Sequence, residues 1–295
     1  MPGMDDYESN AENQWCPGCS NFGILQAVKK AMVELNRRPD QVCMVSGIGQ
    51  AAKLPHYIKC NFFNGLHGRP IPVALGVQAA NPNLTTLVVT GDGDCYGEGG
   101  NHFIHALRRN PNITVMVHNN EIYALTKGQA SPTTPKGEKR TLHVKGVELE
   151  PLNMPAIAIM HDCTFVARGF ARRVDHLKGL LVAAVRHPGL SYVDVLQPCI
   201  TWGTRSIDWY EERIVELGKD HNPGDKRAAM KQALTTEGRI PIGILYQTEP
   251  RAVFAHRYRS KITDGPLAEM TYMDRNQLEE ILSRFRPNIT SKHDP

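Results

Sequence analysis

The sequence has no apolar run that approaches the roughly 20 residues needed to cross a membrane. It also has little net charge: Lys and Arg outnumber Asp and Glu by 34 to 30, and the basic residues are spread along the chain. This balance argues against nucleic acid or an anionic membrane as a partner. The polar start, MPGMDDYESNAENQ, is unlike a signal peptide, so we expect a cytoplasmic protein without membrane contact.

Cysteine is scarce as well, with seven in 295 residues. A chain of this length buries a large core without disulfides, and a reducing cytoplasm disfavours them. We therefore expect any special cysteines to be metal ligands or redox groups. For Cys95 and Cys163 we expect the role of small buried hydrophobic residues.

Strand-like and helix-like segments alternate along the first 200 residues. Apolar, β-branched runs predict strands at 41–49, 85–94, 113–120, 163–169 and 191–197, and helical periodicity predicts helices at 21–36, 70–81, 98–110 and 174–187. This alternation predicts an α/β fold with a doubly wound, mostly parallel sheet.

The remaining segments have weaker patterns. Residues 126–155 are rich in Pro, Gly, Lys and Thr, which indicates a long functional loop. Helical stretches at 206–218, 224–238 and 263–285 have no readable mutual arrangement. We place one domain over residues 1–200 and a partly helical C-terminal extension over 201–295.

Two polar motifs follow predicted strands: GDGD at 91–94 and NNEI at 119–122. In an open α/β sheet, ligands bind where the carboxyl ends of the strands meet. Gly91 and Gly93 let a phosphate approach the backbone, while Asp92 and Asn120 offer the oxygen ligands that Mg²⁺ prefers. A lone GDG is often an ordinary turn. The two motifs together predict a magnesium and diphosphate site.

The spacing of GDG and NN resembles the signature of thiamine diphosphate enzymes. That resemblance implies that Mg²⁺ is held by Asp92, Asn120 and the carbonyl of Ile122. The residues it places at the cofactor are Gly91, Asp92, Gly93, Asp94, Asn120 and Ile122.

Six ordered stretches carry a closer resemblance: WCPGC, GLHGRPIPVALG, VTGDGD, GGNHFIHALRRN, NNEIYALTKGQASPT and VDVLQPC. They resemble the β subunit of 2-oxoacid:ferredoxin oxidoreductases, most closely the 2-oxoglutarate branch. GILYQTEPRAVFAHRY is similar to the C-terminal region of that family.

The resemblance implies a thiamine diphosphate-dependent enzyme in which the cofactors carry the difficult chemistry. The implied reaction is coenzyme A-dependent oxidative decarboxylation of 2-oxoglutarate to succinyl-CoA and CO₂, or the reverse carboxylation. Electrons pass through a [4Fe-4S] cluster to ferredoxin. An α subunit supplies the activating glutamate in an α2β2 heterotetramer, so this chain alone is expected to be inactive. Pyruvate or branched-chain 2-oxoacids stay open as substrates.

Three further residues match family positions beside the substrate. Lys53, in GQAAKLPHY, matches a lysine that faces the 2-oxoacid carboxylate, although a solvated surface lysine is the alternative. Leu125 and Lys127, in YALTKGQ, match the loop beside substrate and diphosphate. Leu125 is equally consistent with ordinary packing.

The CxxC of WCPGC, Cys16 and Cys19, has three readings: a redox dithiol, a zinc site or an iron-sulfur site. A thioredoxin-like dithiol follows a strand, and residues 1–14 do not predict one. A zinc site usually has two close Cys or His pairs, and the sequence has no second pair. Iron-sulfur is therefore favoured, and a non-catalytic zinc or redox module is the alternative.

The resemblance implies four cluster cysteines, of which Cys16, Cys19 and Cys199 match three. At the fourth position, after SGIG, this sequence has Gln50, and an amide is a poor partner for iron among thiolates. Three alternatives are open: replacement by Cys60 (our first choice) or Cys43, a cluster with three thiolates and a labile or different fourth ligand, or no cluster. The last alternative describes a cluster-free thiamine diphosphate decarboxylase half.

Overall fold

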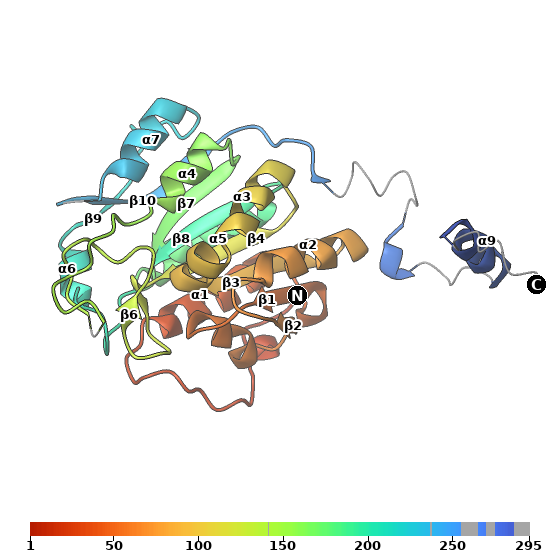
Figure 1. The fold of residues 1–295 in the computed structure, drawn as a ribbon, viewed down its shortest axis with the longest axis horizontal. Coiled ribbons are helices and arrows are strands. Elements are labelled where there is room, and N and C mark those ends of the chain that lie inside the picture. Colours follow the sequence, from red (N-terminus) through yellow and green to blue (C-terminus); the bar gives the residue numbers. More distant parts are fainter. Residues whose placement is uncertain (141, 237, 255–264, 270–274, 286–295) are drawn as a thin grey trace, which may run out of the picture.

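The computed structural model describes residues 1–140, 142–236, 238–254, 265–269 and 275–285. One eight-stranded sheet forms the centre of the molecule, with the strand order β2-β1-β3-β4-β8-β7-β10-β9 (Figure 1). The strands, in that order, are Asn61–Asn64, Val42–Ser46, Thr85–Gly91, Thr114–Asn119, Ser191–Leu196, Phe165–Phe170, Ile240–Gln247 and Ile214–Glu216.

The strands from β2 to β7 in this order are parallel to one another. β10 is antiparallel to β7, and β9 is parallel to β10, so this edge runs against the rest of the sheet. The predicted α/β fold with a doubly wound, mostly parallel sheet is therefore confirmed. A separate ribbon pairs β5 (Ile122–Tyr123) with β6 (Gln129–Ala130).

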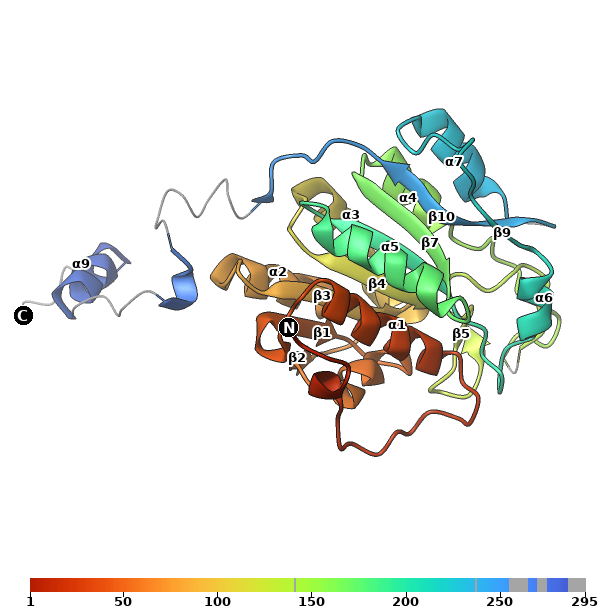
Figure 2. The same ribbon diagram turned by 180° about the vertical axis from the view of Figure 1, so that it is seen from behind.

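Helices cover both faces of the sheet, and each face has its own apolar core. One face carries α1 (Asn21–Glu34) and α5 (Val174–Arg186), as Figure 2 shows. The other face carries α2 (Pro70–Ala80), α3 (Gly100–Arg109), α4 (Met154–Met160) and α7 (Lys226–Leu234). In the described part of the chain, the remaining α-helices are α6 (Ile207–Glu211) and α9 (Arg275–Phe285).

The central strands are apolar runs because both of their faces are covered. Every residue of β1, β7 and β8 is buried. Such strands cannot show polar alternation, which explains the continuous β-branched runs in the sequence. α1 contributes one apolar stripe, with Ile24, Val28 and Met32 fully buried. In these strands and in α1, the apolar pattern of the sequence matches the residues that the fold buries.

Three strands of the eight-stranded sheet are absent from the sequence-based expectation. β2 is an edge strand whose four residues are all exposed, so neither alternation nor an apolar run marks it. The segment 206–218, expected to be helical, forms the short helix α6 and then strand β9. β10 extends the same sheet, so the chain after residue 200 continues the sheet up to Gln247. The boundary at residue 200 stays a prediction.

The C-terminal segment differs from the rest. Within the expected helical stretch 263–285, residues 263–264 and 270–274 lie outside the described residues, and α9 begins at Arg275. Both views show α9 apart from the sheet and its helices (Figures 1 and 2). Among the described residues, no helix is both long enough and apolar enough to span a membrane.

Candidate active site

The turn after β3 buries a carboxylate that lacks a cationic partner. Asp92 is 1% exposed, and its Oδ2 accepts a hydrogen bond of 2.6 Å from the Thr133 hydroxyl. Burial raises the pKa of Asp92 to about 6, and hydrogen bonds from Ser131, Thr133 and the backbone of Asn120 oppose that rise. In the described part of the chain, no Lys, Arg or His side chain forms an ion pair with Asp92. A buried carboxylate is costly unless a cation compensates it, so the site favours a bound cation.

The turn after β4 brings the other two predicted metal ligands beside Asp92. Gly91 pairs with His118 in the parallel register, so the ends of β3 and β4 are adjacent. Asn120 donates through Nδ2 to Gln197 Oε1 at 3.3 Å, and its Oδ1 accepts from the Ile122 N–H at 3.1 Å. A carboxylate, an amide oxygen and a backbone carbonyl form a set of hard oxygen donors that fits Mg²⁺.

The two glycines of GDG meet different surroundings. A Cβ at Gly91 would meet nothing closer than 3.9 Å, which leaves room for a phosphate near this backbone. A Cβ at Gly93 would lie 2.3 Å from the Tyr123 ring. Gly93 is therefore required by the packing of Tyr123, in addition to any role at the diphosphate.

Asp94 accepts hydrogen bonds from three separate segments of this chain. Its Oδ1 accepts from the N–H of Gly68 at 2.7 Å and of Ile48 at 3.1 Å, and its Oδ2 accepts from the Thr90 hydroxyl at 2.6 Å. His67 Nδ1 lies 2.9 Å from Oδ1. Both carboxylate oxygens are thus used to join the loops that follow β1, β2 and β3. A direct contact between Asp94 and the cofactor stays a prediction.

The three predicted substrate residues lie on two segments. Lys53 is half-buried in a 3₁₀ helix, Ala51–Tyr57, and forms no ion pair among the described residues. Leu125 is 42% exposed, so this chain does not pack it in a core. Lys127 is exposed and has a φ of +74°, a strained backbone conformation for a residue other than glycine. No hydrogen bond or ion pair in the described chain links Lys53 to Leu125 or Lys127.

The CxxC loop lies against the turn that contains Cys199. Ser20 donates to the Pro198 carbonyl at 3.2 Å, and the Thr201 hydroxyl lies 3.3 Å from Cys16 Sγ. Burial raises the pKa of the Cys19 thiol, and its neighbours Cys199 and Cys16 add to the rise. The three predicted cysteines are therefore brought together from positions 180 residues apart in sequence (19 and 199).

These cysteines do not form a site for a single metal ion. Within the described ranges, no three Cys, His, Asp or Glu side chains are close enough to bind one ion. The ligands of one zinc each lie about 2.3 Å from the metal and so stay close together. Because a cluster of several irons is larger than one ion, its thiolates are spaced more widely. An iron-sulfur cluster at these three cysteines therefore stays a prediction.

Residue 50 lies beside the CxxC loop. Its backbone carbonyl accepts a 2.9 Å hydrogen bond from the indole N–H of Trp15, the residue before Cys16. The side-chain Oε1 of Gln50 is buried and has no hydrogen-bond partner in the structure. A buried amide oxygen without a partner is unfavourable, which marks this position as a place where a bound group is expected.

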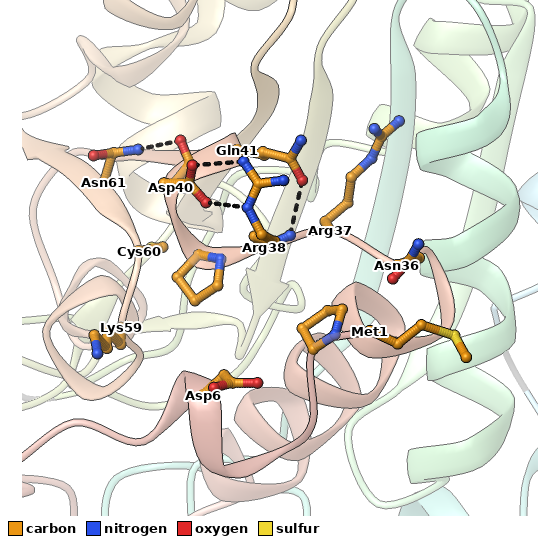
Figure 3. Close-up of a pocket in the computed structure, with 12 residues that line it drawn as sticks. Met1, Asp6, Asn36, Arg37, Arg38, Asp40, Gln41, Lys59, Cys60 and Asn61 are labelled. Carbon is orange, nitrogen blue, oxygen red and sulfur yellow. Dashed lines mark hydrogen bonds and ion pairs between the residues drawn. The ribbon is translucent and has the colours of Figure 1, made fainter.

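Cys60 lies at the amino ends of the strands, whereas Cys199 follows the carboxyl end of β8. Cys60 directly precedes β2, and Cys43 of the parallel strand β1 pairs with Asn61, so both thiols are at the amino ends of their strands. Cys60 lines a pocket of about 850 Å³ beside the ion-paired Arg38 and Asp40 (Figure 3). Burial, and to a smaller extent the neighbouring Cys43 thiol, raises the pKa of the Cys60 thiol to about 12. The structure does not bring Cys60 or Cys43 to the other three cysteines.

The sequence-based search missed a buried polar group around the metal-ligand turns. Asn119 donates to Asp194 at 3.2 Å, and Asp194 lies 3.5 Å from Arg168. Burial raises the pKa of Asp194, although Arg168 opposes this. A cavity of about 310 Å³ adjoins these residues and the ion pair of Glu121 with Arg205 at 2.8 Å. The doubled Asn of the NN motif was the available signal for Asn119, while Asp194 and Arg168 sit within ordinary strand runs.

Two family models match this chain. Residues 41–195 match the thiamine pyrophosphate enzyme C-terminal TPP-binding domain, and residues 199–261 match the C-terminal region of the pyruvate ferredoxin oxidoreductase β subunit. Cys95 and Cys163, which lie within the first match, are buried as predicted.

Several known proteins are similar over most of the chain. 2-Oxoacid:ferredoxin oxidoreductase 1, subunit beta, of Aeropyrum pernix is 42% identical over 86% of this chain and 84% of its own length. The 2-oxoglutarate oxidoreductase subunit KorB of Mycobacterium tuberculosis is 38% identical over 72% of this chain and 58% of its own.

A solved structure extends this likeness to three dimensions. The 2-oxoglutarate:ferredoxin oxidoreductase of Magnetococcus marinus, with 2-oxoglutarate, coenzyme A and succinyl-CoA bound, matches with a TM-score of 0.86 and 33% identity over 96% of each chain. The ordered sequence motifs, the fold and the similar proteins all indicate the same family. The chain therefore belongs to the β subunits of the 2-oxoacid:ferredoxin oxidoreductase family, within the thiamine diphosphate enzymes.

Proposed function

We propose that this chain is the β subunit of a cytoplasmic 2-oxoglutarate:ferredoxin oxidoreductase that converts 2-oxoglutarate and coenzyme A to succinyl-CoA and CO₂, or runs the reverse carboxylation. The observation that carries the proposal is the buried Asp92, without a cationic partner in the described chain, beside Asn120 and Ile122 at adjacent strand ends. These residues would hold Mg²⁺ and, through it, the diphosphate. Thiamine diphosphate, when bound, supplies the chemistry that removes the carboxylate.

The chain's own residues bind and orient the substrate. Lys53, half-buried and without an ion pair in the described chain, is suited to a carboxylate of the 2-oxoacid. Lys127 offers a second cation from a strained backbone position. Leu125 has an exposed apolar surface beside it, which is suited to exclude water from the reacting carbon once a partner covers it.

Cys16, Cys19 and Cys199 would hold a [4Fe-4S] cluster that accepts electrons singly and passes them to ferredoxin. Cys60 and Cys43 lie at the amino ends of their strands, away from Cys199 at the carboxyl end of β8. We therefore propose that this chain supplies only three thiolates. The buried amide oxygen of Gln50, without a hydrogen-bond partner among the described residues, supports the presence of a further ligand near this position. Free cysteines suit the reducing cytoplasm to which we assign the protein.

An α subunit is expected to cover the carboxyl edge of the sheet, in an α2β2 assembly. Exposed apolar side chains occur on the segments that follow β4 and β8 in the chain: Leu125, Leu142, Val144, Leu149, Ile200 and Trp202. Exposed apolar surface of this kind is typical of a protein interface. We infer that the partner supplies the rest of the cofactor site.

The missing thiolate favours one second candidate, a cluster-free thiamine diphosphate decarboxylase half. Iron and acid-labile sulfide, with an EPR spectrum after dithionite reduction, separate the two in the complex of this chain and its α subunit purified without oxygen. Four irons per β chain and ferredoxin reduction with 2-oxoglutarate support the proposal. Zero iron in a complex loaded with thiamine diphosphate contradicts it and favours the cluster-free enzyme. Faster ferredoxin reduction with pyruvate or a branched-chain 2-oxoacid would reassign the substrate.

A further inference from the structure

We propose that Thr133 and Thr134 form a hydroxyl staple that positions the metal ligands by fixing both ligand-bearing turns, an inference that rests on the proposed function. The staple belongs to the SPTT segment, residues 131–134, in the long loop that follows the NN turn after β4. It is a third part of the metal site, and no side chain in it is itself a predicted ligand. Thr133 and Thr134 are therefore positioning residues.

Thr133 joins the two halves of the metal-binding signature. Its hydroxyl lies 2.6 Å from Asp92 Oδ2 and 3.0 Å from Asn119 Oδ1. A threonine hydroxyl has one proton, so it can donate fully to only one of these acceptors. The charged carboxylate at the shorter distance is the stronger acceptor. Thr133 thus fixes Oδ2 of Asp92.

Thr134 holds the backbone between the other two ligands. Its hydroxyl donates to the Glu121 carbonyl at 2.6 Å and accepts from the Ser131 N–H at 2.8 Å. Glu121 has a φ of +61°, a left-handed conformation that costs roughly 1–3 kcal/mol for a residue other than glycine. This residue separates Asn120 from Ile122, so its conformation decides whether their two oxygens face the same point. The Thr134 hydroxyl stabilises that conformation.

The staple is buried, and hydrogen bonds hold it and the turns that it contacts. Thr133 is 7% exposed and Thr134 is 1% exposed, and a turn bond from the Thr134 N–H to the Ser131 carbonyl closes the segment. On the far side, Asn119 is fixed by its bond to Asp194 in β8. Neither turn can move without breaking bonds to the staple. Partners that orient metal ligands in this way commonly change metal affinity about 10- to 100-fold when they are removed.

The test is Mg²⁺ affinity in the intact complex with its α subunit, at saturating thiamine diphosphate, measured by competition with Mn²⁺ and EPR. Thr133→Val keeps the shape of the side chain and removes the hydroxyl, so we expect the Mg²⁺ dissociation constant to rise about 10- to 100-fold. Thr133→Ser restores the donor and should stay within about threefold of the wild type. Thr134→Val should weaken Mg²⁺ in the same direction.

Thr164→Val is the matched control. Thr164 is also buried, and its hydroxyl lies 2.8 Å from His187 Nε2 at the other edge of the sheet. It should leave Mg²⁺ affinity unchanged. Unchanged affinity in Thr133→Val, or equal weakening in the Ser and Val variants, overturns the staple while the proposed function stands. A wild-type complex that binds neither Mg²⁺ nor thiamine diphosphate overturns the proposed function, and the staple with it. If Thr133→Val does not fold, unchanged affinity in Thr134→Val overturns the staple.

Discussion

At the scale of single residues, neighbours in one motif have different tasks. Asp92 and Asp94 are two residues apart and both are buried. Asp92 faces the turn after β4 and has no cationic partner among the described residues. Asp94, in contrast, binds the loops after β1 and β2 through Oδ1 and the Thr90 hydroxyl of β3 through Oδ2. Which loop folds beside each carboxylate therefore decides whether its oxygens are taken up by hydrogen bonds to other loops, as in Asp94, or whether it stays a predicted cation ligand, as in Asp92.

Gly47→Ala should destabilise the protein through Asp94. A Cβ at Gly47 would lie 2.1 Å from Asp94 Oδ2, and Asp94 is held by hydrogen bonds to other loops. Overpacking of this kind typically costs about 1–3 kcal/mol of unfolding free energy. Urea unfolding of the purified chain measures it. Gly179→Ala, on α5 with open space around the new Cβ, is the control and should be neutral or stabilising. Equal stability of the two variants would contradict the role assigned to Asp94.

The cysteines should differ in their reaction with iodoacetamide at pH 8 after iron chelation. Cys16 is exposed, so we expect it to be alkylated first. Cys60 is half-buried, and burial raises its pKa to about 12, so little of its reactive thiolate is present. Peptide mass spectrometry over time gives the order. Alkylation of Cys60 at the rate of Cys16 would contradict its position beside β2.

At the scale of elements, strands with two covered faces and helices with one apolar stripe were predicted within a few residues. The expected helix 21–36 is α1, Asn21–Glu34, and the expected strand 113–120 contains β4, Thr114–Asn119. The edge strand β2 was missed because its exposed residues carry no burial pattern. Prediction therefore succeeded at these elements, where burial leaves a pattern in the sequence, and failed at β2, which is held by backbone pairing at an exposed edge.

The junction between α5 and β7 should make stability depend on pH. His187 follows α5, and its Nε2 lies 2.8 Å from the hydroxyl of Thr164, the residue before β7. Burial lowers the pKa of His187, against an opposing effect of Glu249. The unfolded chain, with a His pKa of about 6.5, then binds more protons below that pH, so unfolding free energy falls as pH drops through it.

His187→Gln isolates this contribution. Urea midpoints at pH 7.5 and 5.5 should fall by less in the variant than in the wild type, because a group that cannot protonate in this range no longer favours the unfolded chain. The full contribution of the buried neutral His is present above about pH 6.5. The same fall in both proteins would show that His187 does not titrate with folding.

At the scale of the whole molecule, the chain beyond residue 200 has two parts. β9 and β10 complete the sheet, and β10 buries Ile240, Ile242 and Leu245. α9 lies apart from the sheet, with Leu278, Ile281, Leu282 and Phe285 exposed by 37–80% (Figure 1). The first part belongs to the core, and the second adds little apolar burial to this chain.

Truncation should separate these two parts. Removal of residues 270–295 should leave the thermal midpoint of the purified chain within about 2 °C, because α9 buries little apolar surface in this chain. Removal of residues 240–295 should prevent folding, because it also removes β10 and exposes its neighbour β7. Differential scanning fluorimetry compares the three lengths. A large fall after the shorter truncation would mean that α9 supports the fold.

The sequence by itself determined the α/β alternation and placed the GDG and NN motifs at strand ends. Parallel strands bring their carboxyl ends to one edge, so that placement was enough to predict that Asp92 and Asn120 meet. Local periodicity carries this information because burial acts on each element directly.

Only the tertiary structure decided which distant loops pack together. Thr133 hydrogen-bonds Asp92, 41 residues away in sequence, and Asp94 accepts from Ile48, 46 residues away. Cys60 lies at the amino ends of the strands, away from the cysteines of the CxxC loop. These contacts depend on strand order, crossover connections and loop paths. No local pattern records them, because residues so far apart in sequence become neighbours only through the packing of the whole sheet.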